Sequence, residues 1–248
     1  MPEKGPPVFL DYGQAELDAA YDQAAYATNR EQLIKRRVRD SELTRLRIGE
    51  PERVAYGPAD IERLDIYRTE RDAAPVFIFI HGGAWRSGRS KDFATPAEMI
   101  LAAALCRRAI LRRAPRCGRT NDGLATRFRP AGGYHQGRHV HQRHVRSDAG
   151  AAIGAQPRSN YVKFDQTTVA TLSPIRHLDR LHAPVIVAYG TCETPEFQRQ
   201  NREFAAAVEN AGKKVQLLVA EHHNHFELPE TLGNPYGLLG RAALDLMA

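Results

Sequence analysis

The chain has 248 residues, of which 42% are hydrophobic and 26% charged, an ordinary composition for a globular protein able to bury a substantial core. No apolar run approaches the roughly 20 residues of a membrane span, and the N-terminus lacks the apolar core of a signal peptide. The three cysteines are too few and too scattered for a disulfide framework or a zinc site. We therefore expect a soluble, cytoplasmic protein without a membrane partner.

The positive charge is concentrated in one window, residues 104–158. The window contains 12 Arg, no Lys and only two acids, Asp122 and Asp148, a balance of +10. Because the whole chain has a formal charge of +6, the remainder carries a balance of −4. The sequence therefore describes an acidic protein that contains a basic segment.

The first half of the chain predicts helices followed by strands. Apolar residues recur at helical spacing from Gln14 to about Arg39, which predicts one or two amphipathic helices. Residues 61–67 alternate as a half-buried strand does, and Pro75–Ile80 is a continuous apolar run typical of a fully buried strand. A helix is predicted over Phe93–Leu105, with Pro96 tolerated in its first turn.

Strands and helices also alternate beyond the basic window. Residues 183–189 predict a buried strand and Val215–Val219 a further strand, and Pro195–Asn210 and Tyr236–Met247 predict helices. This alternation favours a single α/β domain over residues 1–248, with helices on the faces of a mostly parallel sheet. Residues 112–159 show neither the helical nor the strand periodicity of apolar residues. We therefore expect the central strands to be incomplete and residues 104–158 to be poorly structured.

Three predicted strands end in residues that suit acyl-transfer chemistry. The first ends at His81-Gly82-Gly83-Ala84-Trp85, where main-chain N–H groups at a glycine-rich turn can face a developing oxyanion. The segments after the other two contain a carboxylate, Glu193, and an imidazole, His225. In open α/β sheets, ligands bind beyond the carboxyl ends of the strands, so we expect these groups to share one site.

These motifs resemble those of the α/β-hydrolase fold, and more narrowly its esterase and arylformamidase branch. The resemblance rests on HGGAW at 81–85, on ETPEF at 193–197 and on NHF at 224–226. It covers about residues 8–103 and 159–247. It implies hydrolysis of a small aryl formamide or ester through an acyl-enzyme, without a metal or a cofactor.

The resemblance also implies a role for each motif residue. Gly83 and Ala84 would offer N–H groups to the oxyanion, and Gly82 would let the main chain approach closely. Glu193 would orient the imidazole of His225, the general base. His81 would brace the turn, and Trp85 would line the substrate pocket.

Other interpretations of these residues remain open from the sequence. Glu193 could instead interact with the dipole of the helix that begins near Pro195. A metal site built from His222, His223 and His225 is disfavoured because no strong ligand spacing supports it. Cys192 could be considered as a nucleophile, but it follows the strand of the acid and does not lie on a strand-to-helix elbow.

The serine nucleophile of the resembled family is missing. That family carries it on a G-x-S-x-G elbow between the oxyanion strand and the acid strand, and this chain has no such motif. Arg146-Ser147-Asp148-Ala149-Gly150 lacks the first glycine and follows no buried strand. GC-rich codons read out of frame yield Arg, Ala, Gly, Pro and His, so we interpret residues 104–158 as a frame-shifted and shortened elbow region; a natural divergent insert is the alternative.

Two functions follow from these observations, and a third is disfavoured. The first is an arylformamidase-like hydrolase that is impaired for want of a nucleophile, and its alternative is a non-catalytic protein that binds a small aryl or acyl ligand. Nucleic-acid binding by the arginine-rich window is disfavoured, because only Phe128 and Tyr134 interleave its arginines. The natural substrate and the oligomeric state stay open.

Overall fold

The computed structural model describes residues 6–60, 62–70, 74–83, 87–111, 139–141 and 166–247. Two of the predicted site residues, Ala84 and Trp85, lie outside these ranges, as does most of the arginine-rich window. The described ranges combine helices with a parallel sheet and a small antiparallel hairpin, a mixed α/β arrangement. No helix within them is both long and apolar enough to cross a bilayer.

The N-terminal region forms two helices, α1 (Gln14–Ala20) and α2 (Arg30–Ile48), joined through a 3₁₀ turn at Gln23–Tyr26. The prediction of helices from Gln14 is confirmed, but α2 runs nine residues past the expected end at Arg39. It stops at Gly49, whose φ of 89° lies in the region that favours glycine. The extension is buried at Ser41, which accepts a hydrogen bond from the Ala94 N–H at 3.1 Å. This tertiary contact has no signature in the local pattern.

The parallel sheet consists of β3 (His139–His141), β4 (Val185–Gly190) and β5 (Val215–Ala220), in that order. Both predicted C-terminal strands are confirmed, and all six residues of β4 are buried. The register pairs Val185 with Val215 and Gly190 with Ala220, so the two strands end side by side. β3 lies where the sequence predicts no strand; its ladder uses main-chain groups, which every residue type except proline can supply in full.

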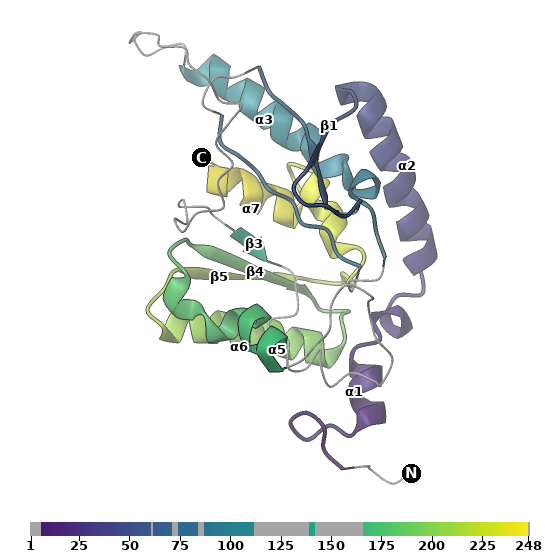
Figure 1. Ribbon diagram of the computed structural model, residues 1–248, viewed down its shortest axis with the longest axis vertical. Coiled ribbons are helices and arrows are strands. Elements are labelled where there is room, and N and C mark those ends of the chain that lie inside the picture. The colour runs from purple at the N-terminus through teal and green to yellow at the C-terminus, as the bar shows by residue number, and fades with distance from the viewer. Residues whose placement is uncertain are drawn as a thin grey trace.

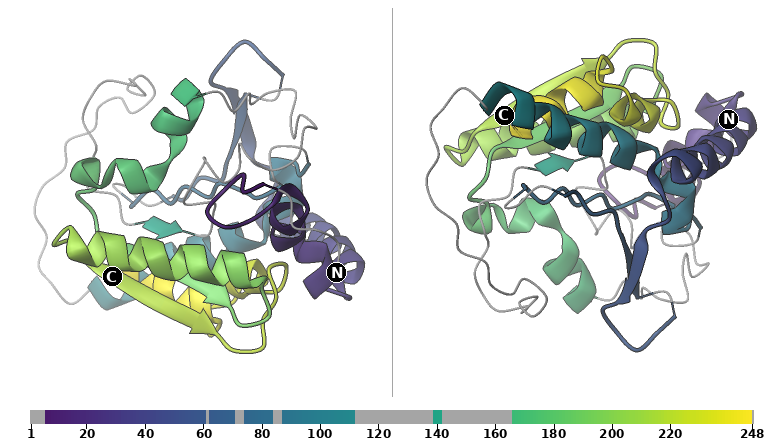
Figure 2. Two further views of the ribbon diagram at one scale, coloured as in Figure 1. Left: turned by 90° about the horizontal axis from the view of Figure 1, so that it is seen from below. Right: turned by 90° about the horizontal axis from the view of Figure 1, so that it is seen from above.

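Helices cover both faces of this sheet (Figures 1 and 2). On one face, α6 (Pro195–Asn210) packs on β4 through a cluster that includes Val187, Phe204 and Val208. On the other face lie α7 (Leu238–Met247), α3 (Thr95–Leu111) and a 3₁₀ segment, Leu228–Gly233. α3 extends beyond the predicted end at Leu105. The remaining helical segments are α5 (Gln166–Leu172) and 3₁₀ turns at Ser90–Phe93, Pro174–Arg176 and Leu178–Arg180.

A separate antiparallel hairpin joins β1 (Glu52–Ala55) to β2 (Arg63–Ile66). The predicted strand at 61–67 therefore exists, but it pairs with β1 and not within the parallel sheet. The sequence does not predict β1, because its residues Glu52-Arg53-Val54-Ala55 do not alternate between polar and apolar types. In the structure, three of these four residues are exposed. Main-chain pairing, rather than a buried face, makes it a strand.

The prediction of a fully buried strand at Pro75–Ile80 is wrong for this structure. These residues are not assigned to a strand, and the exposed fractions of Val76, Ile78 and Ile80 are 86%, 69% and 72%. The two phenylalanines on the opposite side of the run make contacts: Phe77 packs against a buried cluster that includes Leu228 and Leu239, and the ring centroid of Phe79 lies 6.0 Å from that of Phe93. An apolar run becomes a buried strand only where neighbouring strands and helices enclose it. The described residues enclose this run on the Phe77 side alone.

Candidate active site

The candidate acid, Glu193, lies on the turn that follows β4. Its side chain folds back so that Oε1 accepts a hydrogen bond from the Gly190 N–H at 3.1 Å. The Glu193 N–H donates to the Gly190 carbonyl, also at 3.1 Å, which closes the turn. Glu193 is only 1% exposed. The end of a fully buried strand therefore holds a buried carboxylate in a defined orientation.

The N-terminus of α6 does not use this carboxylate as a cap. Thr194 occupies the N-cap position and its hydroxyl accepts from the Phe197 N–H at 3.4 Å, while Pro195 fills the first helical position. The two Glu193 oxygens instead contact Gly190 and His225. Glu193 therefore binds Gly190 and His225 and does not cap α6; it still lies next to the N-terminus of that helix, where the alternative interaction with the helix dipole applies.

His225 lies on the loop after β5 and meets the carboxylate directly. Its Nδ1 is 3.3 Å from Glu193 Oε2, which confirms that the two side chains lie within hydrogen-bonding reach. An ionised carboxylate only accepts, so this contact assigns the proton to Nδ1 and leaves Nε2 as the basic nitrogen. The rings of Phe197 and Phe226 meet the imidazole edge to face, with centroids at 5.2 and 5.6 Å. The His225 side chain is 31% exposed, so the imidazole is oriented and still accessible.

The loop of His225 is joined to the turn after β4 by one hydrogen bond between main-chain groups and one from a main-chain N–H to a side-chain hydroxyl. The Cys192 N–H donates to the His223 carbonyl at 3.1 Å, and the His222 N–H donates to the Thr191 hydroxyl at 2.8 Å. His222 has a φ of 60°, which is uncommon for a residue with a side chain. Gly190 permits this close approach, as its lack of a Cβ leaves room for the His223 carbonyl. The acid turn and the imidazole loop therefore form one packed unit.

The neighbouring candidates lie at the surface of this unit. His222 and Cys192 are exposed, and the Nδ1 of His223 contacts the Glu221 carbonyl at 2.7 Å. Across the residues that the structure describes, no group of three or more His, Cys, Asp or Glu side chains is placed to hold a metal ion. Of the three histidines, His225 alone contacts the buried carboxylate.

The described part of the predicted oxyanion segment forms its own tight turn. His81 stacks on Phe93 with ring centroids 4.9 Å apart, and its Nδ1 lies 2.7 Å from the Gly82 carbonyl. Gly83 has a φ of 134°, and a Cβ there would lie 1.7 Å from the Ser87 carbonyl oxygen. Glycine is therefore required at position 83. The hydrogen bonds and ring contacts described for His81, Gly82 and Gly83 do not reach Glu193 or His225.

Four polar side chains support the site: Asn224 of the NHF motif, and three others that lie outside the motifs, Glu227, Gln23 and Asn29. Asn224 Oδ1 accepts from the Phe226 and Glu227 N–H groups, and Glu227 Oε2 accepts from the Asn224 N–H at 2.9 Å. This reciprocal arrangement is a capping box, and Asn224 followed three residues later by Glu227 is its sequence signature. Gln23 and Asn29 bind the two site loops from far away in the chain, and no local pattern marks either of them.

Comparisons with known proteins bear on this geometry. No protein-family model matches the chain. The chain is similar to the kynurenine formamidase of Danio rerio, with 26% identity over 238 residues that cover 78% of this chain and 80% of that protein. This likeness is distant, and it supports an arylformamidase-like relationship.

Proposed function

We propose that this chain is an arylformamidase-like α/β-hydrolase whose Glu193–His225 pair is arranged for acyl transfer from a small aryl formamide or ester. The observation that carries the proposal is the 3.3 Å contact between the buried carboxylate and His225 Nδ1. The order of the groups supports it, because the acid follows β4 and the imidazole follows the adjacent parallel strand, β5. The distant likeness to a kynurenine formamidase favours a formamide as the substrate class.

The Glu193–His225 pair would provide general acid–base chemistry at His225 Nε2. Glu193 holds the proton on Nδ1 and would stabilise the imidazolium that forms when Nε2 takes a proton. Gly82, Gly83 and Ala84 are proposed as the oxyanion segment, with His81 bracing the turn and Trp85 lining the pocket. The conformation of Gly83 supports a turn of this kind. If a nucleophile carried the acyl group, water that gives up its proton to His225 Nε2 would attack the acyl carbon and release the free acid from the nucleophile; no recognisable residue of this chain carries that group.

Low turnover is part of the proposal. The sequence has no G-x-S-x-G elbow, so the acylating step has no recognisable nucleophile. A hydrolase that keeps its oxyanion donors and its binding pocket without a working triad retains about 10³–10⁴-fold acceleration over water at best. We also propose that residues 1–248 fold as one domain, since Gln23 and Asn29 bind residues beyond the arginine-rich window.

The test follows both binding and hydrolysis by the full chain. Formanilide should shift the NMR signals of the His225 ring at about millimolar concentration, and aniline, which lacks the formyl group, should shift them less. Hydrolysis of formanilide and of p-nitrophenyl acetate should be no faster than in a His225→Ala variant. An unperturbed His225 ring at saturating formanilide would contradict the proposed site.

Turnover that depends on His225 and that a serine-directed organophosphate abolishes would overturn the low-turnover part of the proposal. The labelled serine, mapped between residues 86 and 173, would then identify a nucleophile without the usual motif.

The second candidate is a non-catalytic protein that binds a small aryl ligand, and the missing nucleophile motif is the observation in its favour. Such a protein should bind formanilide tightly enough to raise its melting temperature by several degrees, as mass action requires. It should show no hydrolysis above background. An impaired hydrolase should instead bind only weakly and gain little thermal stability.

A further inference from the structure

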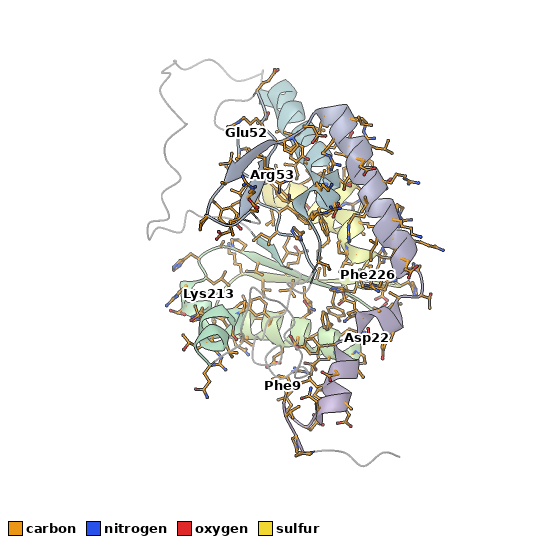
Figure 3. The ribbon with its side chains drawn as sticks, turned by 45° about the vertical axis from the view of Figure 1, so that its right-hand side comes forward. Phe9, Asp22, Glu52, Arg53, Lys213 and Phe226 are labelled. Atoms are coloured by element: carbon orange, nitrogen blue, oxygen red, sulfur yellow. The ribbon has the colours of Figure 1, made fainter. Side chains whose placement is uncertain are left out.

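Two side-chain amides near the N-terminus reach the two loops of the site. Gln23 lies in the 3₁₀ turn Gln23–Tyr26, and Asn29 immediately precedes α2. Figure 1 shows α1 and α2 along one side of the sheet. In Figure 3, the labelled Asp22 and the labelled Phe226, the neighbour of His225, are seen on the same side of the molecule. The amides of Gln23 and Asn29 face the site from the side of the N-terminal helices.

Gln23 holds the turn of the acid by two hydrogen bonds. Its Nε2 donates to the Thr194 hydroxyl at 2.9 Å, and its Oε1 accepts from the Thr194 N–H at 3.2 Å. Gln23 is 7% exposed, and Thr194, which follows Glu193 directly, is fully buried. The acid turn therefore satisfies one buried main-chain N–H through a side chain 171 residues away. Loss of that partner would leave the N–H unsatisfied, which is costly in a buried turn.

Asn29 holds the loop of the imidazole in the same manner. Its Nδ2 donates to Glu227 Oε1 at 2.7 Å, and its Oδ1 accepts from Asn224 Nδ2 at 3.0 Å. Asn224 and Glu227 form the capping box that encloses His225. Asn29 therefore binds both ends of the turn that carries the imidazole.

The residues that lead directly into the segment bearing the two amides are anchored to α6. Leu17 and Tyr21 form a buried cluster with Phe197 of α6 packed against it. The Tyr12 hydroxyl donates to Glu196 Oε2 at 3.2 Å, and Gln200 Nε2 donates to the Tyr21 hydroxyl. A short, anchored segment can therefore act as a fixed reference for two loops that leave different strands.

We infer that the segment from Gln23 to Asn29 is a positioning element that sets the Glu193–His225 contact, with Gln23 orienting the acid turn and Asn29 the imidazole loop. The 3.3 Å distance lies at the long end of the hydrogen-bond range, so a small displacement of either loop breaks the contact. The catalytic meaning of this element rests on the proposed function. Its structural effect can be measured without substrate.

The readout is the tautomer of His225, observed by nitrogen-15 NMR of the ring at an alkaline pH at which its signals no longer change with pH. The variants Gln23→Met and Asn29→Leu keep the approximate size of each side chain and remove its hydrogen bonds. Each should change the ratio of the Nδ1–H to the Nε2–H form by roughly threefold towards Nε2–H. Gln23→Glu, which keeps an acceptor for the Thr194 N–H and loses the donor, should give an intermediate change.

Gln14→Met is the matched control. Gln14 is exposed and its Nε2 bonds to Asp18 within α1, so its removal should leave the tautomer ratio unchanged. A Gln23→Met chain with a lower melting temperature and an unchanged tautomer ratio would show a merely structural role and overturn the inference. If Gln23→Met and Asn29→Leu do not fold, the Gln23→Glu ratio decides, and no change there would equally overturn it.

The outcome is separable from that of the proposed function. A tautomer change without formanilide binding would leave the positioning element standing and remove the hydrolase site. Formanilide binding with an unchanged tautomer ratio in the variants would overturn the positioning element and leave the proposed hydrolase site standing.

Discussion

The main chain of His223 lies directly against Gly190, so that a Cβ on Gly190 would be 2.0 Å from the His223 carbonyl oxygen. Such a distance is impossible, and the obstacle is main chain rather than a flexible side chain. The imidazole loop and the last residue of β4 consequently fit only when position 190 is glycine.

Gly190→Ala should therefore displace the His225 loop and lower the free energy of unfolding by roughly 3 kcal/mol, the upper range for overpacking. Urea denaturation measures the loss. Gly82→Ala is the stability control, because a Cβ at position 82 meets no atom within 4 Å. Equal stability of the two variants would contradict the packing of the His223 carbonyl on β4.

Arg199 compensates a buried carboxylate next to the site. Glu196 is 1% exposed and accepts from Arg199 Nε and Nη2, both at 2.8 Å. This hydrogen-bonded pairing raises the pKa of Arg199 above its ordinary value. Arg199→Met leaves the buried charge uncompensated and should cost about 3 kcal/mol of stability, measured by denaturant unfolding.

The control for that change is Arg39→Met. Arg39 pairs with Asp40 at the surface, with 68% and 38% of the two side chains exposed, and its loss should cost under about 0.5 kcal/mol. A similar loss in both variants would mean that the Glu196 carboxylate is not held in a buried pair.

The apolar run at Pro75–Ile80 should tolerate truncation. Val76 is 86% exposed, whereas Val187 in β4 is 1% exposed. Val76→Ala should change the unfolding free energy by less than about 0.5 kcal/mol, and Val187→Ala should lower it by roughly 2 kcal/mol. Comparable losses for the two valines would indicate that the run is a buried strand after all.

Tyr12 should make stability decline at alkaline pH. Burial, followed by the charge of Glu196 and the hydrogen bond to it, raises the pKa of Tyr12 above its ordinary value of 10.0. Above that ordinary value the unfolded chain loses the phenolic proton before the folded chain does, so the folded state loses stability as the pH rises. Below it, the contribution of Tyr12 is fully present.

Tyr12→Phe should consequently show a shallower fall in unfolding free energy than the unchanged chain as the pH rises above about 10. Tyr67, whose pKa is also raised by burial, titrates in both chains and cancels in the comparison. If the unfolding free energies of the two chains fell in parallel with pH, the result would contradict a hydrogen bond from Tyr12 to Glu196 of α6.

The sequence by itself determined the elements whose pattern lies within one short segment, namely the buried strand β4 and the amphipathic helix α6. The unbroken apolar run of β4 and the amphipathic pattern of α6 specify a strand buried on both faces and a helix with one apolar side, and both form as predicted. Because parallel neighbouring strands end at the same edge, the sequence could predict that Glu193 and His225 follow strands that end side by side.

Only the tertiary structure decided the features that need a distant partner. The exposure of Ile78 depends on which segments enclose its run, and the pairing of β1 depends on main-chain groups that carry no residue signature. Gln23 meets Thr194, which lies 171 positions further along the chain, and Asn29 meets Glu227, which lies 198 positions further. A side-chain amide looks the same in sequence whether it faces water or a buried turn, because its hydrogen-bond partners exist only once the chain has folded.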